Sequence, residues 1–449
     1  MSAAPARVGV LERAVRDAVL VAGPRRHGRV RSVVGLQVEV EGLDAAIGDA
    51  MWIESTVGAL PGEVIALRAD ACSCMVFGDL RGIRVGALAG VADHAPMVAI
   101  GNGLLGRVLD GLGRPIDGGP LPTDVENCSL EARVPHPLRR AHVDVALSLG
   151  IRALDTLVPC GRGQRLGLFA GSGVGKSTLL SMIARRTEAQ VAVIALVGER
   201  GREVREFIER DLGPEGLARS VVVVATSDQP PLVRLRAAFV ATTIAEWFRD
   251  RGNDVLLMMD SLTRFAMAQR EVGLAAGEPP ATRGYPPSTF GLLAGLLERA
   301  GAGEIGSITG LYTVLVEGDD LNEPVADHAR SILDGHVMLT RRLATAGHFP
   351  SIDVLDSISR VTGAITTAAQ RALATQLRQL LAASRDSRDL IEIGAYAAGS
   401  NPTVDRYLDL QDDIDAFLRQ DPDDLSSASA SWERLATLLN GSIDQGVGA

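Results

Sequence analysis

A glycine-rich segment, Ala-Gly-Ser-Gly-Val-Gly-Lys-Ser at residues 170–177, constrains the fold more than any other part of this sequence. The apolar run 165–170 before it predicts a strand, and a helical pattern follows it. The segment fits the spacing G-x-x-x-x-G-K-[ST], except that alanine holds the first position. Backbone N–H groups of such a loop curl around phosphate, and the N-terminus of the next helix adds a favourable dipole. The sequence therefore predicts a phosphate-binding loop between a strand and a helix.

The use of lysine supports this interpretation. Of the 45 lysine and arginine residues in the chain, only Lys176 is a lysine. Because arginine serves everywhere else, this position requires a compact ammonium rather than a planar guanidinium. We expect Lys176 to reach the β- and γ-phosphates of a nucleotide and Ser177 to coordinate Mg²⁺. The predicted nucleotide-binding residues of the loop are Gly171, Ser172, Gly173, Val174, Gly175, Lys176, Ser177 and Thr178.

Acidic residues follow two other apolar runs. Asp260 ends the run Leu-Leu-Met-Met-Asp, and a carboxylate at the tip of a strand beside a phosphate loop is typical of a Mg²⁺ site. Glu199 and Glu203 lie in Gly-Glu-Arg-Gly-Arg-Glu, directly after a further apolar run. A carboxylate there can orient and polarise the water that attacks the γ-phosphorus. The alternative is a surface ion pair with Arg200 or Arg202.

The rest of the chain divides by pattern. Short apolar segments between Gly, Pro and Asp turns predict a small antiparallel barrel, and the Gly- and Pro-rich residues 101–140 predict an ordered linker. From about residue 145, apolar strands alternate with helices, which predicts a mostly parallel, doubly wound α/β domain. Leucines at helical spacing follow residue 366. The predicted parts are an N-terminal helix over 1–24, the barrel over 25–95, the α/β domain over 96–365 and a helical domain over 366–449.

The expected strands of the α/β domain are apolar throughout, as in sheets that helices cover on both faces. They are 165–170, 191–197, 221–225, 255–259 and 310–316.

The first 24 residues predict a separate amphipathic helix. Leu11, Val15, Ala18 and Ala22 share one helical face, and Gly23-Pro24 ends the pattern. Such a helix either packs on its own domain or docks on a partner.

Composition limits the function classes. The net charge is −10 and aromatic residues are 4% of the chain, so we expect no nucleic-acid partner. The four cysteines lack the spacing of zinc ligands, which favours reduced thiols. Charged residues lie where a signal peptide would be apolar, and no apolar run reaches the roughly 18 to 20 residues of a membrane-spanning helix. These features predict a cytoplasmic protein.

Several motifs together resemble one family, the catalytic ATPases of the rotary and export type, which share a RecA-like core and form hexameric rings. Besides the phosphate loop they are GERGRE, DSLTRFA at 260–266 and PSIDVLDSIS at 350–359. Within this family the sequence is most similar to the type III export ATPases, above all those of flagella. The stretches that carry this likeness are LGPEGLARSVVVVATSDQPPLVRLRAA, GEPPATRGYPPSTFGLLAGLLERAG and LVEGDDLNEPVADHARSILDGHV.

This resemblance implies a fold, a reaction and roles for single residues. The fold is a RecA-like P-loop domain with a small N-terminal β-barrel and a C-terminal α-helical domain, and the reaction is Mg²⁺-dependent hydrolysis of ATP. Glu199 corresponds to the catalytic carboxylate, Arg200 to an arginine that contacts phosphate, and Glu203 to an outer group of the Mg²⁺ site. Arg360 corresponds to an arginine finger that reaches a neighbour's γ-phosphate. Phe349 corresponds to an aromatic residue that stacks on adenine.

The resemblance also implies partners and a location. One chain carries both the loop and Arg360, which indicates a homohexameric ring. A stator-like regulatory protein is expected at the N-terminal helix, with export-gate membrane proteins, export substrates and their chaperones as further partners. The location would be cytoplasmic and peripheral, at the export apparatus of the inner membrane.

Four other functions stay open at this stage. The first is a secretion ATPase of a virulence injectisome rather than of a flagellum. The second is the catalytic subunit of a rotary ATP synthase, although Glu199 and Arg360 in one chain suit a homomeric ring better. The third is an RNA-translocating hexamer, which the acidity disfavours and RNA-stimulated ATPase activity would reveal. The fourth is a regulatory subunit without turnover, which an ATPase assay would detect.

Overall fold

The computed structural model describes residues 27–92, 95–132, 134–316, 320 and 322–441. The chain divides into two compact units, Met1–Pro96 and Met97–Ala449. The amphipathic helix predicted over 1–24 lies outside the described residues, so this helix and its docking role stay predictions.

The first unit is a closed barrel with the strand order β1-β2-β5-β4-β3-β6. Its strands are β1 (Gly28–Val34), β2 (Gln37–Glu41), β3 (Ala50–Ser55), β4 (Gly58–Leu67), β5 (Ala71–Val76) and β6 (Leu88–Val91). Every strand pair is antiparallel, so the predicted barrel is confirmed. Alternating apolar side chains, such as Val38 and Val40 of β2, fill its interior.

Strand β6 closes the barrel, and the sequence pattern did not predict this strand. β6 has only four residues and contains Gly90. A Cβ atom at Gly90 would lie 2.7 Å from the indole ring of Trp52 in β3, so the closely packed ring requires glycine there.

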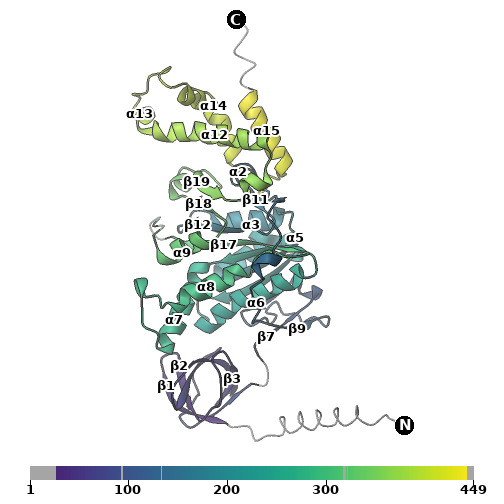
Figure 1. Ribbon diagram of the computed structural model, residues 1–449, viewed down its shortest axis with the longest axis vertical. Helices are drawn as coiled ribbons and strands as arrows, with labels where there is room; N and C mark the ends of the chain where they lie inside the picture. The colour runs from purple at the N-terminus through teal and green to yellow at the C-terminus, as the bar shows by residue number, and fades with distance from the viewer. Residues whose placement is uncertain (1–26, 93–94, 133, 317–319, 321, 442–449) are drawn as a thin grey trace, which may run out of the picture. The chain divides into compact units, whose positions relative to one another are not determined.

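The second unit is built on a nine-stranded sheet with the path β19-β18-β12-β17-β15-β13-β14-β8, with β16 paired to β17. Figure 1 shows β19, β18, β12 and β17 in this order. The strands are β8 (Val108–Asp110), β12 (Arg165–Ala170), β13 (Val191–Glu199), β14 (Ser220–Thr226), β15 (Asp254–Asp260), β16 (Gly301–Ala302), β17 (Ser307–Leu315), β18 (Gly335–Leu339) and β19 (Ile352–Ser359). All pairs are parallel except those of β16 and β19. The predicted doubly wound α/β domain is confirmed, and all five expected strands belong to this sheet.

Helices cover this sheet, which explains why its central strands, such as β13 and β14, are mostly apolar. The main ones are α3 (Lys176–Arg186), α6 (Pro231–Arg249), α7 (Leu262–Ala276), α8 (Ser288–Glu298) and α9 (Pro324–Ile332). Helix α6 packs on β13, β14 and β15, and α7 and α9 pack on β17. Strand β13 is buried along its whole length, so a continuous apolar sequence stabilises it.

The linker expected over 101–140 is wrong in part, because this segment contributes one strand to the nine-stranded sheet and another to a separate two-stranded sheet. β8 pairs with β14 at the sheet edge, and β9 (Glu126–Ser129) pairs with β7 (Met97–Ile100). Two bonds of 2.7 Å join the Arg107 guanidinium to the Asp117 carboxylate and hold the loop beside β8. Gly and Pro mark the tight turns of this segment, whereas its strands are too short to be recognised.

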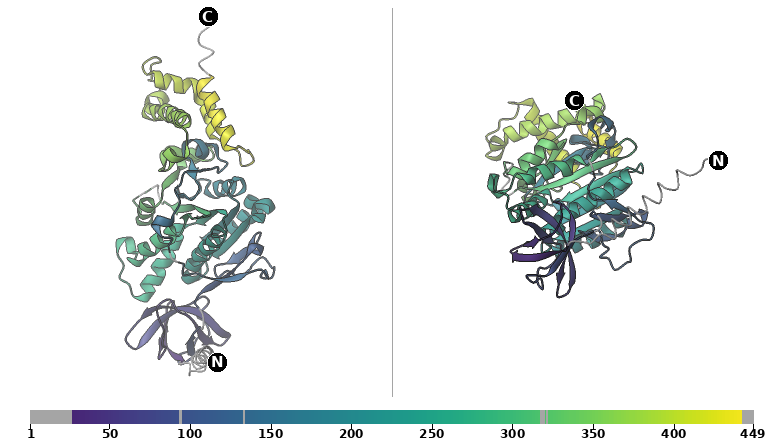
Figure 2. Two further views of the ribbon diagram at one scale, coloured as in Figure 1. Left: turned by 45° about the vertical axis from the view of Figure 1, so that its right-hand side comes forward. Right: turned by 60° about the horizontal axis from the view of Figure 1, so that its bottom comes forward.

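Residues 368–440 form a helical domain, as predicted (Figure 2). It contains α12 (Ala368–Asp386), α13 (Arg388–Glu392), α14 (Pro402–Leu418) and α15 (Ala428–Asn440). Leu377 and Leu380 of the predicted leucine stripe are buried. Helix α2 (Arg152–Leu157) packs against α12, α14 and α15, and the buried Arg152 Nε donates to the Phe417 carbonyl at 2.9 Å. The helical domain is thereby tied to the α/β domain through α2.

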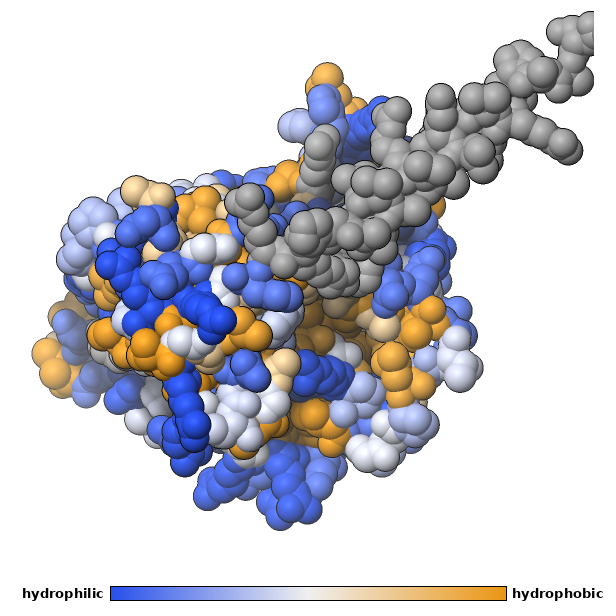
Figure 3. All heavy atoms as spheres, turned by 90° about the horizontal axis from the view of Figure 1, so that it is seen from below, coloured by the Kyte–Doolittle hydropathy of each residue, from blue (hydrophilic) through white to orange (hydrophobic). Residues whose placement is uncertain are grey.

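Exposed apolar side chains of the barrel include Val34, Ile47 and Val57. On the face in Figure 3, hydrophobic side chains are interspersed with hydrophilic ones. Among the described helices, none combines the length and the apolar character that crossing a lipid bilayer would require.

Candidate nucleotide site

The phosphate loop connects the end of β12 to the start of α3, where the sequence predicts it. Gly173 and Gly175 have φ angles of 77° and 85°, which favour glycine over any residue with a Cβ. Val174 is buried and anchors the loop, since the Ser351 hydroxyl donates to its carbonyl at 2.6 Å. The loop and first turn of α3 therefore present backbone N–H groups at an exposed helix N-terminus.

Lys176 lies between two buried carboxylates from neighbouring strands. Its Nζ atom forms an ion pair with Asp260 at the end of β15 and lies 3.5 Å from Glu199 Oε1 at the end of β13. Only 5% of Asp260 and 6% of Glu199 is exposed. Because β13 and β15 are adjacent and parallel, their carboxyl ends meet beside the loop. Three of the predicted site residues thus converge on one point.

Two further side chains complete this cluster, and the sequence interpretation missed both. Thr313 of β17 donates from Oγ1 to Asp260 Oδ1 at 2.7 Å. Arg264 of α7 lies 3.2 Å from Glu199 Oε2 and also donates to the Gly198 carbonyl. Thr313 is one of several hydroxyl side chains in its strand and no motif marks it, whereas Arg264 lies within the motif DSLTRFA.

The surroundings of Glu199 raise the pKa of its carboxyl group to about 7. The main cause is burial, which penalises the charged form, followed by the nearby negative charge of Asp260. Lys176 and Arg264 act in the opposite direction, and a hydrogen bond with Glu203 adds to the rise. The pKa of Glu199 is therefore close to neutral pH, as is favourable for a general base or for a group that orients an attacking water.

The oxygens of this cluster suit a hard cation. Glu199 Oε1 is buried beside Lys176 Nζ and accepts no hydrogen bond from the described residues, so it can accept one from a water. Asp260 adds a buried carboxylate, and Ser177 adds an exposed hydroxyl at the first turn of α3. Carboxylate and hydroxyl oxygens are the ligands that Mg²⁺ prefers beside phosphates. The residues present therefore fit a magnesium–nucleotide complex.

Arg200 and Glu203 lie further out. Both are exposed, and Arg200 Nη1 lies 3.4 Å from Glu203 Oε1 at the start of helix α4 (Gly201–Glu206). This surface ion pair is the alternative that the sequence left open for them. Their roles toward phosphate and Mg²⁺ stay predictions.

Phe349 borders the phosphate loop. A Cβ atom at Gly175 would lie 3.2 Å from its ring, which remains 43% exposed. The N–H group of Gln420, after α14, donates to the Phe349 carbonyl at 2.9 Å and fixes this position. An exposed aromatic face next to the loop is suited to stacking on a base.

Arg360 is the one predicted catalytic residue that lies away from this cluster. It follows β19, which runs antiparallel to β18. Arg360 therefore lies at the amino end of the parallel strands, whereas Lys176 lies at their carboxyl end. Its side chain is exposed, and Nη2 lies 3.5 Å from the Arg330 carbonyl. Arg360 therefore cannot act on a phosphate held by its own loop.

The fold and the site define an ATPase with a RecA-like core. Residues 150–359 match the ATP synthase alpha/beta family, nucleotide-binding domain, and residues 366–437 match the T3SS EscN ATPase C-terminal domain. The chain belongs to the ATP synthase alpha/beta family, within the group that comprises the flagellar and type III secretion ATPases.

Two relatives and one solved structure illustrate the similarity to these ATPases. The chain is 49% identical over 417 residues to the flagellum-specific ATP synthase of Bacillus subtilis (strain 168), covering 92% of this chain and 95% of the relative. It is 47% identical over 429 residues to the type 3 secretion system ATPase of Xanthomonas euvesicatoria, covering 95% and 97%. The structure of the assembled ATPase EscN in complex with its central stalk EscO, from enteropathogenic E. coli, superposes with a TM-score of 0.85 at 43% identity, covering 92% of this chain and all of that one.

Proposed function

We propose that this chain is the Mg²⁺-dependent ATPase that energises type III protein export during flagellar assembly. The observation that carries the proposal is the convergence of Lys176, Glu199 and Asp260 beside the phosphate loop. The similarity to both flagellar and secretion ATPases supports export as the purpose of hydrolysis. The test of the flagellar role is complementation. The chain should restore motility to a strain that lacks its flagellar ATPase, and should not restore effector secretion to a strain that lacks its injectisome ATPase.

Each residue of the site has a role in this proposal. The loop N–H groups and Lys176 bind the β- and γ-phosphates, and Phe349 stacks on adenine. Ser177 and Asp260 would hold Mg²⁺, with Glu203 in its outer coordination sphere, and the bound cation neutralises charge on the phosphates. Arg200 would contact a phosphate oxygen.

The residues contribute mainly position and charge, because the transfer of the γ-phosphoryl group to water needs little covalent chemistry from the protein. The Glu199 carboxylate accepts a hydrogen bond from the attacking water and aligns its oxygen with the γ-phosphorus. Arg264 holds Glu199 from the other side, since its guanidinium reaches both Oε2 and the carbonyl of Gly198. Thr313 likewise fixes Asp260.

Arg360 supports a ring of identical subunits. Since it lies across the sheet from its own loop, the site is complete only where another copy supplies this arginine. The assembled state of EscN supports a homohexamer here. A stalk-like protein is a further proposed partner, as EscO is for EscN, together with the export gate, export substrates and their chaperones. The proposed location is the cytoplasmic side of the inner membrane.

The Glu199→Gln variant should bind Mg-ATP normally but hydrolyse it at least roughly 10²-fold more slowly, because the amide keeps the shape and loses the charge that orients the water. Single-turnover hydrolysis and nucleotide affinity measure the two effects separately. Glu206→Gln, on the adjacent helix α4, is the matched control and should retain the activity of the wild type. A variant that binds weakly and hydrolyses at the normal rate would assign Glu199 a structural role.

The pH dependence should follow the same group. Because the pKa of Glu199 is raised to about 7 and the carboxylate is the working form, kcat/KM should rise as the pH increases through about 7 and then level off. Profiles between about pH 5 and pH 9 test this. The residual activity of Glu199→Gln should lack that inflection. An unchanged inflection in the variant would assign it to another group.

A further inference from the structure

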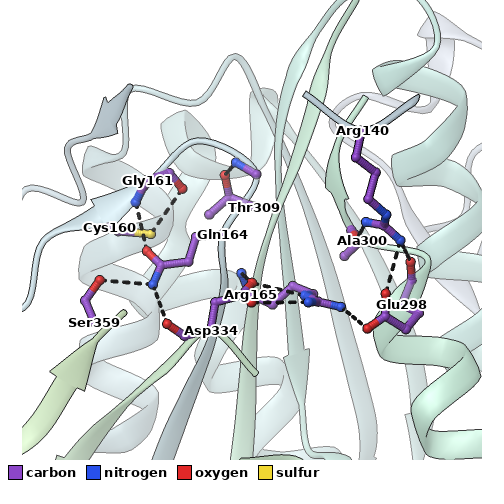
Figure 4. A network of polar contacts seen from close by, with 11 residues as sticks. Arg140, Cys160, Gly161, Gln164, Arg165, Glu298, Ala300, Thr309, Asp334 and Ser359 are labelled. Carbon is purple, nitrogen blue, oxygen red and sulfur yellow. Dashed lines mark hydrogen bonds and ion pairs between the residues drawn. The ribbon is translucent and has the colours of Figure 1, made fainter. Parts of the chain in front are cut away.

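A hydrogen-bond network at the amino end of the sheet fixes the backbone that carries Arg360. Figure 4 shows its central part, the contacts of Gln164 with Gly161, Asp334 and Ser359. The carbonyl of Asp334 accepts from the N–H of Arg360 and from Gln164 Nε2, both at 3.0 Å. Gln164 Nε2 also donates to Ser359 Oγ at 3.0 Å. Two hydrogen bonds thus reach residues 359 and 360, and a third joins Gln164 to the Asp334 carbonyl that accepts one of them.

The side chain at the centre of this network is rigid. Gln164 is fully buried, and its carboxamide oxygen accepts from the Gly161 N–H at 2.9 Å. Both ends of the amide are therefore engaged, with the nitrogen on two acceptors and the oxygen on a donor. The amide orientation is set by these partners, and a swing would leave several buried polar groups without a bond.

Asp334 is clamped in turn by Arg165. The backbone N–H and Nε of Arg165 donate to Asp334 Oδ2 at 3.0 and 3.1 Å, and Nη2 donates to Oδ1 at 3.2 Å. Arg165 also pairs with Glu298, which pairs with Arg140. Such bidentate contacts fix geometry as well as adding energy. The carbonyl that receives the Arg360 N–H is thus held from strand β12 and helix α8.

Close packing of β18 on β19 adds to this restraint. Gly335 lies opposite Ser359, and a Cβ atom there would lie 2.5 Å from the Ile358 carbonyl oxygen. Only glycine permits this approach. The Arg360 side chain, by contrast, is exposed, and among the described residues it donates one long hydrogen bond, of 3.5 Å, to the Arg330 carbonyl. The backbone therefore sets the point from which this side chain extends.

We propose that Gln164 and Asp334 are positioning residues for Arg360, and that through it they act in the site of the adjacent subunit rather than in their own. This inference rests on the proposed role of Arg360 as a finger. A displacement of about 1 Å far from the chemistry can reduce a rate on the order of 10²-fold. The loss should appear in kcat, with KM nearly unchanged, because the phosphate loop and Phe349 lie at the other edge of the sheet.

Mixed assemblies test the proposal with Gln164→Met, which keeps the side-chain length and removes the amide. The variant alone should lose roughly 10- to 10²-fold in kcat. Mixed with Lys176→Ala, which has an intact finger but no working loop, it should regain activity. Mixed with Arg360→Ala, which has a loop but no finger, it should not. A general structural defect would not produce this asymmetry.

Thr309→Val is the matched control, because buried Thr309 accepts from the N–H of Gly163 in the same turn at 2.9 Å but does not contact residues 359 and 360. The activity that Thr309→Val shows in mixed assemblies should be the same with Lys176→Ala and with Arg360→Ala. Ser359→Ala provides a milder variant that removes one bond of the network and should show the same asymmetry with a smaller loss.

Equal recovery of Gln164→Met and Ser359→Ala with both mixing partners would overturn the positioning role, and so would recovery with neither. The mixture of Lys176→Ala with Arg360→Ala separates the two claims. If it recovers while the Gln164 and Ser359 variants show no asymmetry, only the positioning role fails. If it stays inactive despite co-assembly, the finger itself fails, and the positioning role fails with it.

Discussion

Turnover by the Lys176→Arg variant is expected to fall on the order of 10³-fold, the upper range for removal of one well-placed charge-stabilising donor. Arginine is the residue that this chain uses at every other basic position, so the exchange keeps the charge and tests geometry alone. Lys176 Nζ lies between two buried carboxylates, in contact with Asp260 and 3.5 Å from Glu199 Oε1. A guanidinium is wider and planar, and it cannot occupy this point while also reaching over the phosphates.

The control for this variant is the reverse exchange on the same helix. Arg185→Lys near the end of α3 alters a side chain that contacts the Pro422 carbonyl, far from the loop, and should keep turnover within about twofold. Multiple-turnover assays and thermal unfolding of both variants separate lost chemistry from lost stability. Turnover of Lys176→Arg close to that of the wild type would show that the ammonium of this lysine is not the group over the phosphates.

Much of this fold could be predicted because its sheet is covered on both faces. Strands such as β12 and β14 appear in the sequence as apolar runs with polar residues only at their ends, and β12 leads directly into the glycine-rich loop. β6 and β8 could not be predicted, since three or four residues carry no periodicity. β8 also gains its stability from pairing Val108 with Val222, and no local pattern encodes a partner so distant along the chain.

The site divides in the same way. Lys176, Glu199 and Asp260 each follow or end an apolar strand. Because the carboxyl ends of parallel strands lie at the same side of a sheet, the sequence alone predicts that these residues lie close together. Thr313 lies within its strand and has no motif, so its bond to Asp260 depends on the pairing of β15 with β17. The position of Arg360 depends on the antiparallel direction of β19 relative to β18, and no spacing of residues in the sequence predicts this direction.

Arg360→Ala should bind nucleotide almost normally but hydrolyse it about 10³- to 10⁵-fold more slowly, the range that arginine fingers contribute. The physical reason is its place in the fold. Arg360 is exposed at the edge of the sheet opposite the loop, so its removal leaves the nucleotide contacts of its own subunit intact. Nucleotide affinity and single-turnover rates measure the two effects. A large loss of affinity would instead indicate that Arg360 supports the fold of its own site.

The ring requirement is tested by mixing two inactive variants, Lys176→Ala and Arg360→Ala. Activity should return in part, because some interfaces then pair an intact loop with an intact finger. The wild-type rate should also rise more steeply than linearly with protein concentration, since an isolated chain lacks a complete site.

Arg341→Ala is the matched control. The Arg341 side chain is exposed near the loop of its own subunit, 3.5 Å from the Ser172 carbonyl. If this variant loses activity, mixing it with Lys176→Ala should restore no more of that activity than mixing it with Arg360→Ala. Mixtures that co-assemble yet stay inactive would exclude a finger acting between subunits. A specific activity that stays constant on dilution below the assembly range would show that one chain contains the whole site.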